Sequence, residues 1–238
     1  MQKTPDITDV PRLQGTKFLR DAFAESRSLV SPGMSPDKAF GLLRKLLGAE
    51  EFSKPDLGHF CHLLRKNAKS QKNPDKRTTG LFISAALYNI SNKFYKARLY
   101  DPEPLEIMTM LDLKGIEEVS YLGYRFPKGA LHLIGQFGDY TGSKLGGDAR
   151  LMIVGSAANF VGAYQEGHIY VTGDVGDFAG KGMKSGSSLE IGGKYGSHLG
   201  WQTEADSTIY YHNLDGERKT ITGKPLELAE AVRGRDGE

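Results

Sequence analysis

The residues best suited to chemistry cluster in "GDVGDFAG", residues 173–180, which contains three glycines and two aspartates. Glycine-rich turns bind phosphate through backbone N–H groups, and carboxylate oxygens bind hard cations. A phosphate loop needs the pattern G-x-x-x-x-G-K-[ST], but Lys181 is followed by Gly182. A dinucleotide fingerprint needs a helix directly after the loop, and the next segment here predicts a strand. These glycines therefore favour a structural role over phosphate binding.

Short polar residues occupy equivalent positions in four similar segments: Asp139, Asn159, Asp177 and Ser197. Stacked at one corner of a repeat, such side chains could present oxygens to a hard cation. They could instead cap turns by accepting hydrogen bonds from nearby backbone N–H groups. Asn159 and Ser197 are neutral, so the series carries less negative charge than a cation site needs. Turn capping is therefore the favoured interpretation.

A second group is formed by His59, Cys61 and His62, which lie close together on a predicted helix. A structural zinc site normally needs four ligands, and the sequence shows no convincing further ligand to complete the set. Cys61 shares the apolar stripe of the helix, so we predict a core cysteine beside two surface histidines. A Cys–His nucleophilic pair would need spatial proximity that the sequence does not establish.

Charged residues elsewhere give weaker signals. The basic segment 65–77, "RKNAKSQKNPDKR", lacks the interleaved aromatics that stack on bases, and the net charge of the chain is only +2. A solvated loop or a frayed helix end is therefore favoured over a nucleic-acid site. Polysaccharide-cleaving enzymes place acidic and basic side chains on one exposed sheet, and the outward candidates here are scattered. These candidates are Asp148, Arg150, Glu166, His168, Glu190 and Lys194.

The composition of the 238 residues, 39% hydrophobic and 25% charged, is that of a soluble globular protein. The longest apolar stretch, "GLFISAALYNI", is too short to cross a bilayer, and the polar first residues do not resemble a secretory signal. The single cysteine excludes an intrachain disulfide and fits a reducing compartment. We therefore expect a cytoplasmic location and no membrane association.

Glycine placement reveals an internal repeat. Nineteen of the 30 glycines lie between Gly123 and Gly200. The segments "VSYLG", "GDYTG", "ANFVG", "GDFAG" and "GSHLG" end at glycines separated by 19, 20, 18 and 20 residues. Each of the last four follows a short run rich in Leu, Ile and Val, which predicts a strand.

A unit of this length cannot bury its own apolar face, whereas stacked copies can. Glycines would then lie at corners that need a positive φ or close approach of the next coil. The expected fold is mainly β, a right-handed single-stranded parallel β-helix of about five coils. In this arrangement we expect Phe178 to fill an interior column, with Gly176 and Gly180 forming the bends.

The segment "VTGDVGDFAGKGMKSG" resembles the signature of the GXGXG domain. That family includes the C-terminal domain of the glutamate synthase large subunit and the C subunit of formylmethanofuran dehydrogenase, which are right-handed parallel β-helices. The resemblance covers about residues 129–204 and implies a structural role in packing domains or subunits together. The glycine ladder and this signature give the following structural motif residues: Gly123, Gly138, Gly142, Gly162, Gly173, Asp174, Gly176, Asp177, Phe178, Gly180, Gly182, Gly186, Gly196 and Gly200.

The N-terminal region reads as helical. Ser35 and Pro36 predict a helix start, and Gly48 predicts its end. Further helices are predicted over residues 55–67 and 79–93, with a weaker one over 16–26. We divide the chain into a helical region (1–100), the β-helix (101–213) and a C-terminal helix and tail (214–238). Because exposed strand ends promote aggregation, we expect the two flanking regions to cover the ends of the β-helix.

The sequence is compatible with two functions. The first is a non-catalytic structural or assembly module within a redox or amidotransfer enzyme complex, with a protein partner or a second copy of the chain bound to it. The alternative is an enzyme or small-ligand-binding protein with its site between the helices and the β-helix. The sequence predicts no catalytic residue, metal ligand or cofactor, and nucleic-acid binding is disfavoured.

Overall fold

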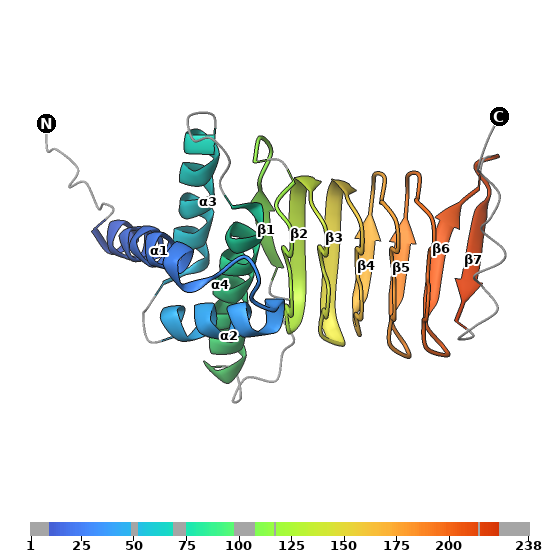
Figure 1. Ribbon diagram of the computed structural model, residues 1–238, viewed down its shortest axis with the longest axis horizontal. Coiled ribbons are helices and arrows are strands. Elements are labelled where there is room, and N and C mark those ends of the chain that lie inside the picture. Colours follow the sequence, from blue (N-terminus) through green and yellow to red (C-terminus); the bar gives the residue numbers. More distant parts are fainter. Residues whose placement is uncertain are drawn as a thin grey trace, which may run out of the picture.

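The computed structural model describes residues 10–48, 52–68, 75–97, 108–116, 118–213 and 215–223. These residues form a parallel β-solenoid of about five turns, with four helices at its N-terminal end (Figure 1). The seven strands lie in one sheet in sequence order. They are β1 (Met108–Asp112), β2 (Lys128–Phe137), β3 (Asp148–Ala157), β4 (His168–Val171), β5 (Ser188–Ile191), β6 (Thr208–His212) and β7 (Arg218–Thr222).

The register of the strands produces the expected interior columns. From β1 to β6 all pairs are parallel, and one inward column aligns residues of β2 to β6. This column contains Leu131, Leu151, Ile169, Leu189 and Ile209, each no more than 2% exposed. Alternation of side chains across each strand explains why a single apolar row from each turn fills the interior. The prediction of a stacked parallel β-helix of about five coils is confirmed.

The four helices are α1 (Val10–Leu29), α2 (Pro36–Leu47), α3 (Lys54–Ala68) and α4 (Lys76–Ala97). The N-cap of α2 is Ser35, whose hydroxyl accepts a hydrogen bond from Lys38 N at 3.4 Å. Each helix predicted for the N-terminal region corresponds to one of these elements, and the weak signal over residues 16–26 belongs to a longer helix. None of the helices in the described ranges has the length and apolar character that a bilayer crossing requires.

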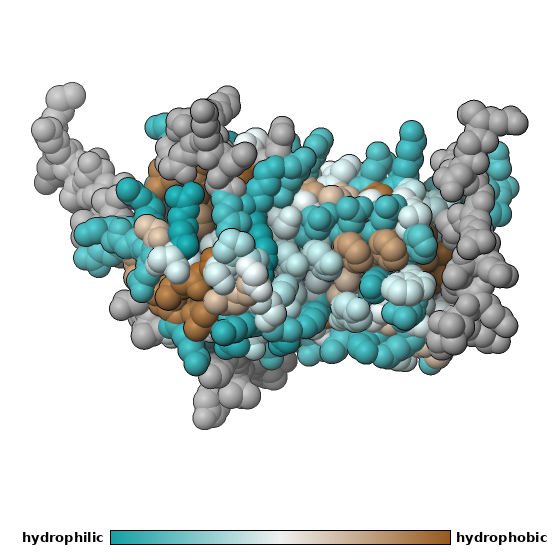
Figure 2. Space-filling model, in the orientation of Figure 1, coloured by the Kyte–Doolittle hydropathy of each residue, from teal (hydrophilic) through white to brown (hydrophobic). Residues whose placement is uncertain are grey.

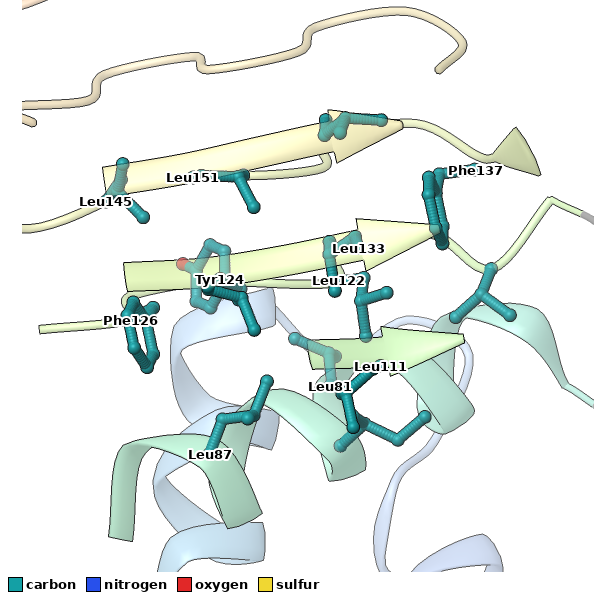
Figure 3. Packing of buried hydrophobic residues seen from close by; sticks show 14 of the residues in the cluster. Leu81, Leu87, Leu111, Leu122, Tyr124, Phe126, Leu133, Phe137, Leu145 and Leu151 are labelled. Carbon is teal, nitrogen blue, oxygen red and sulfur yellow. The ribbon is translucent and has the colours of Figure 1, made fainter. Parts of the chain in front are cut away.

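The helices cover the N-terminal end of the solenoid, with α4 against its first turn. The Ser84 hydroxyl donates to the Tyr121 carbonyl at 2.9 Å, and Ser91 donates to the Lys128 carbonyl at 3.0 Å. Figure 3 shows Leu81 and Leu87 of α4 beside the core side chains of the first strands. The helical region and the solenoid therefore share one hydrophobic core, as expected for a covered end.

At the other end, β7 pairs antiparallel with β6 and reverses the chain direction. This strand lies beyond the expected end of the β-helix at residue 213, so the solenoid sheet extends further than predicted. The predicted C-terminal helix after Pro225 and the predicted boundary near Tyr100 lie outside the described residues.

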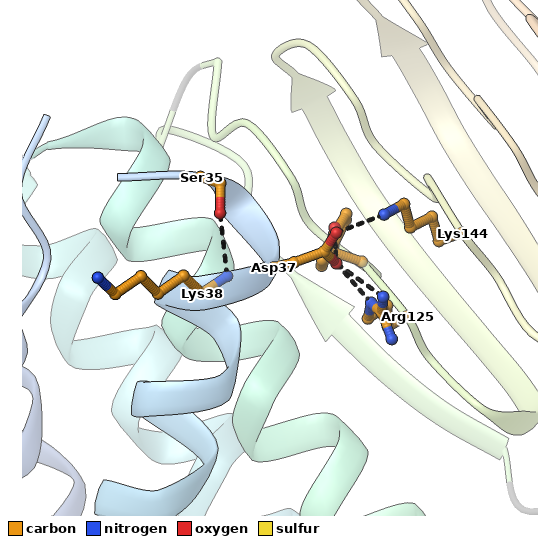
Figure 4. A network of polar contacts seen from close by, with 6 residues as sticks. Ser35, Asp37, Lys38, Arg125 and Lys144 are labelled. Atoms are coloured by element: carbon orange, nitrogen blue, oxygen red, sulfur yellow. Dashed lines mark hydrogen bonds and ion pairs between the residues drawn. The ribbon is translucent and has the colours of Figure 1, made fainter. Parts of the chain in front are cut away.

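A polar cluster joins α2 to two successive turns of the solenoid (Figure 4). One carboxylate oxygen of Asp37 accepts a hydrogen bond from the Tyr124 hydroxyl at 2.6 Å and pairs with the Arg125 guanidinium at 2.8 Å. The other oxygen pairs with Lys144 Nζ at 2.6 Å. Partial burial by itself raises the pKa of Asp37, but the hydrogen bonds from Lys144 and Tyr124 and the charge of Arg125 outweigh it and lower the pKa to about 2.

The Asp37→Asn variant should lose stability at neutral pH but little in strong acid. Because the pKa of Asp37 is lower in the folded chain than in the unfolded one, its contribution is present above about pH 4 and disappears as the pH falls toward 2. The side chain is 48% exposed, so the expected loss at pH 7 is only about 1 kcal/mol. Urea unfolding at both pH values measures the difference. An equal loss at pH 7 and pH 2 would contradict the assignment.

Candidate functional site: an aromatic face on the solenoid

One corner of each turn places an aromatic side chain on the outside of the solenoid. Rings of equivalent residues stack in a single column with nearly parallel planes, and the column contains Tyr121, Tyr140, Phe160, Phe178 and His198. Neighbouring ring centroids lie 4.6–5.1 Å apart, which is about one strand spacing. Four of these side chains are half-buried and His198 is exposed. The column is therefore part of the molecular surface.

The expectation that Phe178 fills an interior column is wrong. Phe178 has φ +57, in the left-handed region, as do its equivalents in the other turns. This conformation turns the ring outward, and the next residue of each turn points inward instead. Ala179 is 1% exposed and its equivalents Val161 and Leu199 are 0% and 2% exposed. Stacking between the rings offsets part of the cost of holding non-glycine residues at positive φ.

Three further residues widen this surface. Lys181 Nζ lies 4.5 Å from the Trp201 ring centroid, and 5.6–5.7 Å from those of Phe178 and Phe160. The Tyr164 ring is 42% exposed and packs against Gly182, where a Cβ would meet the ring at 2.6 Å. We call the stacked column together with Tyr164, Lys181 and Trp201 the aromatic face. In Figure 2 a band of pale and brown residues runs along the solenoid between hydrophilic ones.

The sequence analysis singled out Phe178 but placed it in the interior, and it did not identify Tyr164, Lys181 or Trp201 as members of a surface. A signal was available, because Lys181 and Trp201 each follow their column residue by three positions, while Tyr164 follows its own by four. These offsets place them around the same corner as the rings. The offsets become informative only once the column residues are known to point outward.

The motif glycines fall into two groups. The glycines of the first group have a positive φ and lie at the end of a corner or shortly after it. They are Gly123, Gly142, Gly162, Gly180, Gly182, Gly186 and Gly200. The other group lies against the backbone or polar side chains of the preceding turn, where a Cβ would clash, and contains Gly138, Gly173, Gly176 and Gly196. Gly180 therefore makes a bend as predicted. Gly176 does not have a positive φ and is instead a point of close approach.

The short polar residues beside the column form a ladder of hydrogen bonds between turns. Asn159 N donates to Asp139 Oδ1 at 3.0 Å, and Asp177 N donates to Asn159 Oδ1 at 2.8 Å. Ser197 N continues the series by donating to Asp177 Oδ1 at 2.7 Å. A parallel ladder includes Asp174, which accepts from Lys194 N at 2.7 Å. These side chains cap backbone N–H groups, as predicted, but the N–H belongs to the next turn.

The outer face of the sheet holds three further exposed apolar residues. Met110, Val154 and Tyr170 are 63%, 39% and 39% exposed. On the same sheet His168 Nδ1 lies 2.8 Å from the Ser188 hydroxyl. Arg218 of β7 pairs with Glu190 at 3.3 Å. In the described part of the chain no three His, Cys, Asp or Glu side chains are placed to hold a metal ion.

Three basic side chains of segment 65–77 form contacts near the junction between the helices and the solenoid. Arg65 pairs with Asp112 at 3.0 Å, and Lys76 pairs with Glu118. Arg77 donates to the Met34 carbonyl and lies 5.9 Å from the Tyr121 ring centroid at one end of the stacked column. These three residues lie near helix ends, one of the two expectations for this segment, and they contact the solenoid or the loop before α2 in addition to solvent. Residues 69–74 lie outside the described part.

The helix α3 holds the cysteine and both histidines as predicted. Cys61 is 2% exposed, whereas His59 and His62 are exposed on the helix surface. Burial raises the pKa of the Cys61 thiol to about 12. Because the thiolate is the nucleophilic form, the folded chain keeps this residue inert.

Cys61 should resist thiol reagents at pH 8 until the chain unfolds. With a pKa of about 12, on the order of 10⁻⁴ of the thiol is ionised at that pH. Labelling of the native protein should be less than about 1% as fast as labelling of the chain in denaturant. Spectrophotometric thiol titration measures both rates, and rapid labelling of the native protein would show that the site is accessible.

Comparisons with known proteins add no identification: no family model, no curated protein and no solved structure matches this chain.

Proposed function

We propose that this chain is a non-catalytic assembly module that binds a protein partner through its aromatic face. The observation that carries the proposal is a continuous column of five aromatic rings on the surface of a rigid solenoid, widened by Tyr164 and Trp201. Tyr and Trp dominate the binding energy of protein interfaces, because they bury a large area at a small cost in conformational entropy. A solenoid holds such residues in fixed positions before binding, which reduces the ordering cost further.

The residues that could do chemistry already have structural partners. Asp139 and Asp177 accept backbone hydrogen bonds, His168 contacts Ser188, and Asp37 holds α2 against the solenoid. The junction between α4 and the first turns, where the alternative function would place a ligand site, contains core side chains (Figure 3). These observations support a binding module over an enzyme.

The resemblance to GXGXG domains supports a more specific form of the proposal. In that family the β-helix packs domains or subunits together, so the partner would belong to a redox or amidotransfer enzyme complex. The single buried thiol, Cys61, is compatible with a reducing compartment. The cytoplasm is therefore the location that we propose for the complex.

Native purification tests the assembly function. The tagged chain, expressed in its own cells and isolated at low salt, should sediment in a complex heavier than 26.1 kDa, with a second polypeptide in fixed ratio or as a defined oligomer. The matched control is the tag alone. Recovery of the chain only as a 26.1 kDa monomer at micromolar concentration would contradict the proposal.

A further inference from the structure

We infer that the aromatic face binds an acidic segment of the partner, with a carboxylate at Lys181 and neighbouring apolar side chains against Trp201 and Phe178. This inference rests on the proposed function and names the chemistry of the partner. It commits to a peptide segment in which acidic and apolar residues alternate.

The first observation is the electrostatic situation of Lys181. Its ammonium group is held among the rings of Phe160, Phe178 and Trp201. Within the described residues, no carboxylate lies at ion-pair distance from it. By contrast, Lys144 pairs with Asp37 and Lys184 pairs with Glu204. A half-buried cation on an apolar surface without an anion of its own chain is complementary to a carboxylate supplied by a partner.

The second observation is the orientation of the stacked rings. Their planes are within 4–9° of parallel, so each inner ring covers the faces of its neighbours. What remains exposed along the column is the ring edges. An aromatic ring has a negative face and a positive edge. The exposed edges therefore reinforce Lys181 in attracting negative oxygens, while their C–H groups still provide apolar contact.

The same geometry disfavours two other ligand classes. Nucleic-acid bases and sugar rings stack on aromatic faces, and within this column those faces are already occupied. An acidic peptide therefore fits better than RNA.

The chain contains one tryptophan, so its emission reports this site alone. The full-length protein is titrated with a blocked peptide of sequence GEFELEG, with GQFQLQG as the uncharged control. The acidic peptide should change the Trp201 emission saturably, and the control peptide should bind at least about tenfold more weakly. No saturable change with the acidic peptide, or equal binding of the two peptides, would overturn the inference. Tighter binding of poly-uridine than of the acidic peptide would overturn it as well.

Variants localise the effect. Lys181→Met should weaken binding of the acidic peptide about tenfold, whereas Lys181→Arg, which keeps the positive charge, should bind it as the wild type does. Tyr170→Ala, on the outer face of the sheet, should leave binding unchanged. Circular dichroism establishes that each variant is folded. Wild-type affinity in a folded Lys181→Met variant would contradict the placement of the carboxylate.

The native complex separates this inference from the proposed function. In the native purification, Lys181→Met and Trp201→Ala should release the partner, whereas Tyr170→Ala should retain it. A complex that persists in both aromatic-face variants would refute the inference and the placement of the interface on the aromatic face, while the assembly function itself would stand. The absence of any complex with the wild-type chain would refute both.

Discussion

Replacing Gly80 with alanine should separate the helices from the solenoid and destabilise the chain by about 3 kcal/mol or more. Gly80 lies inside α4, where a Cβ would overlap the Ser120 carbonyl oxygen and lie 2.9 Å from its carbon. A backbone group cannot rotate away as a side chain can, so α4 must move off the first turn. Urea unfolding followed by circular dichroism measures the loss, and gel filtration detects association of the uncovered end.

Two other helical glycines provide matched controls. A Cβ at Gly41 in α2 or Gly58 in α3 would meet nothing within 4 Å. Alanine at either position should therefore stabilise the chain, by up to about 1 kcal/mol, because glycine is a poor helix former. Opposite signs for Gly80→Ala and Gly58→Ala are expected. A Gly80→Ala variant as stable as the wild type would contradict the close contact between α4 and the solenoid.

The Gly180→Val variant should lose about 3 kcal/mol or more of folding free energy. Gly180 has φ +70, and a Cβ there would lie 2.7 Å from Met183 Sδ, 3.0 Å from Ile209 Cδ1 and 3.3 Å from Leu189 Cδ2. Valine would thus combine the strain of a left-handed residue, about 1–2 kcal/mol, with overpacking of the interior, about 1–3 kcal/mol. Thermal and urea unfolding measure the sum.

Gly186→Val isolates the backbone strain. Gly186 has φ +77, but a Cβ there would meet nothing within 4 Å. Its valine variant should lose only the conformational part, about 1–2 kcal/mol. Equal losses at positions 180 and 186 would mean that the interior of the solenoid accommodates the extra atoms, against the packing described above.

The interior of the solenoid was predictable because its signal is local and repeated. Runs such as those containing Leu131 and Leu151 alternate with the strand period, and stacking them follows from their inability to bury themselves singly. The helix that begins after Ser35 was predictable for a similar reason, since its cap and first turn are adjacent in sequence.

The aromatic face was not predictable, because simple alternation fails at the corners. A left-handed residue such as Phe178 reverses the expected direction of its side chain, and an aromatic residue gives no advance sign of a positive φ. Long-range pairs were also hidden. Arg65 and Asp112 are 47 positions apart, so the basic segment looked solvated until the fold brought its partners near.

Hydroxyl-radical footprinting of the native complex tests the central claim most directly. Oxidation of side chains is measured by mass spectrometry for the isolated chain and for the chain bound to its partner. Trp201 and Tyr164 should be oxidised several-fold more slowly in the complex, while Tyr170 and Met110 on the outer sheet face should be oxidised at unchanged rates. Protection of Tyr170 and Met110, with Trp201 and Tyr164 unaffected, would contradict the assignment of the aromatic face as the binding surface.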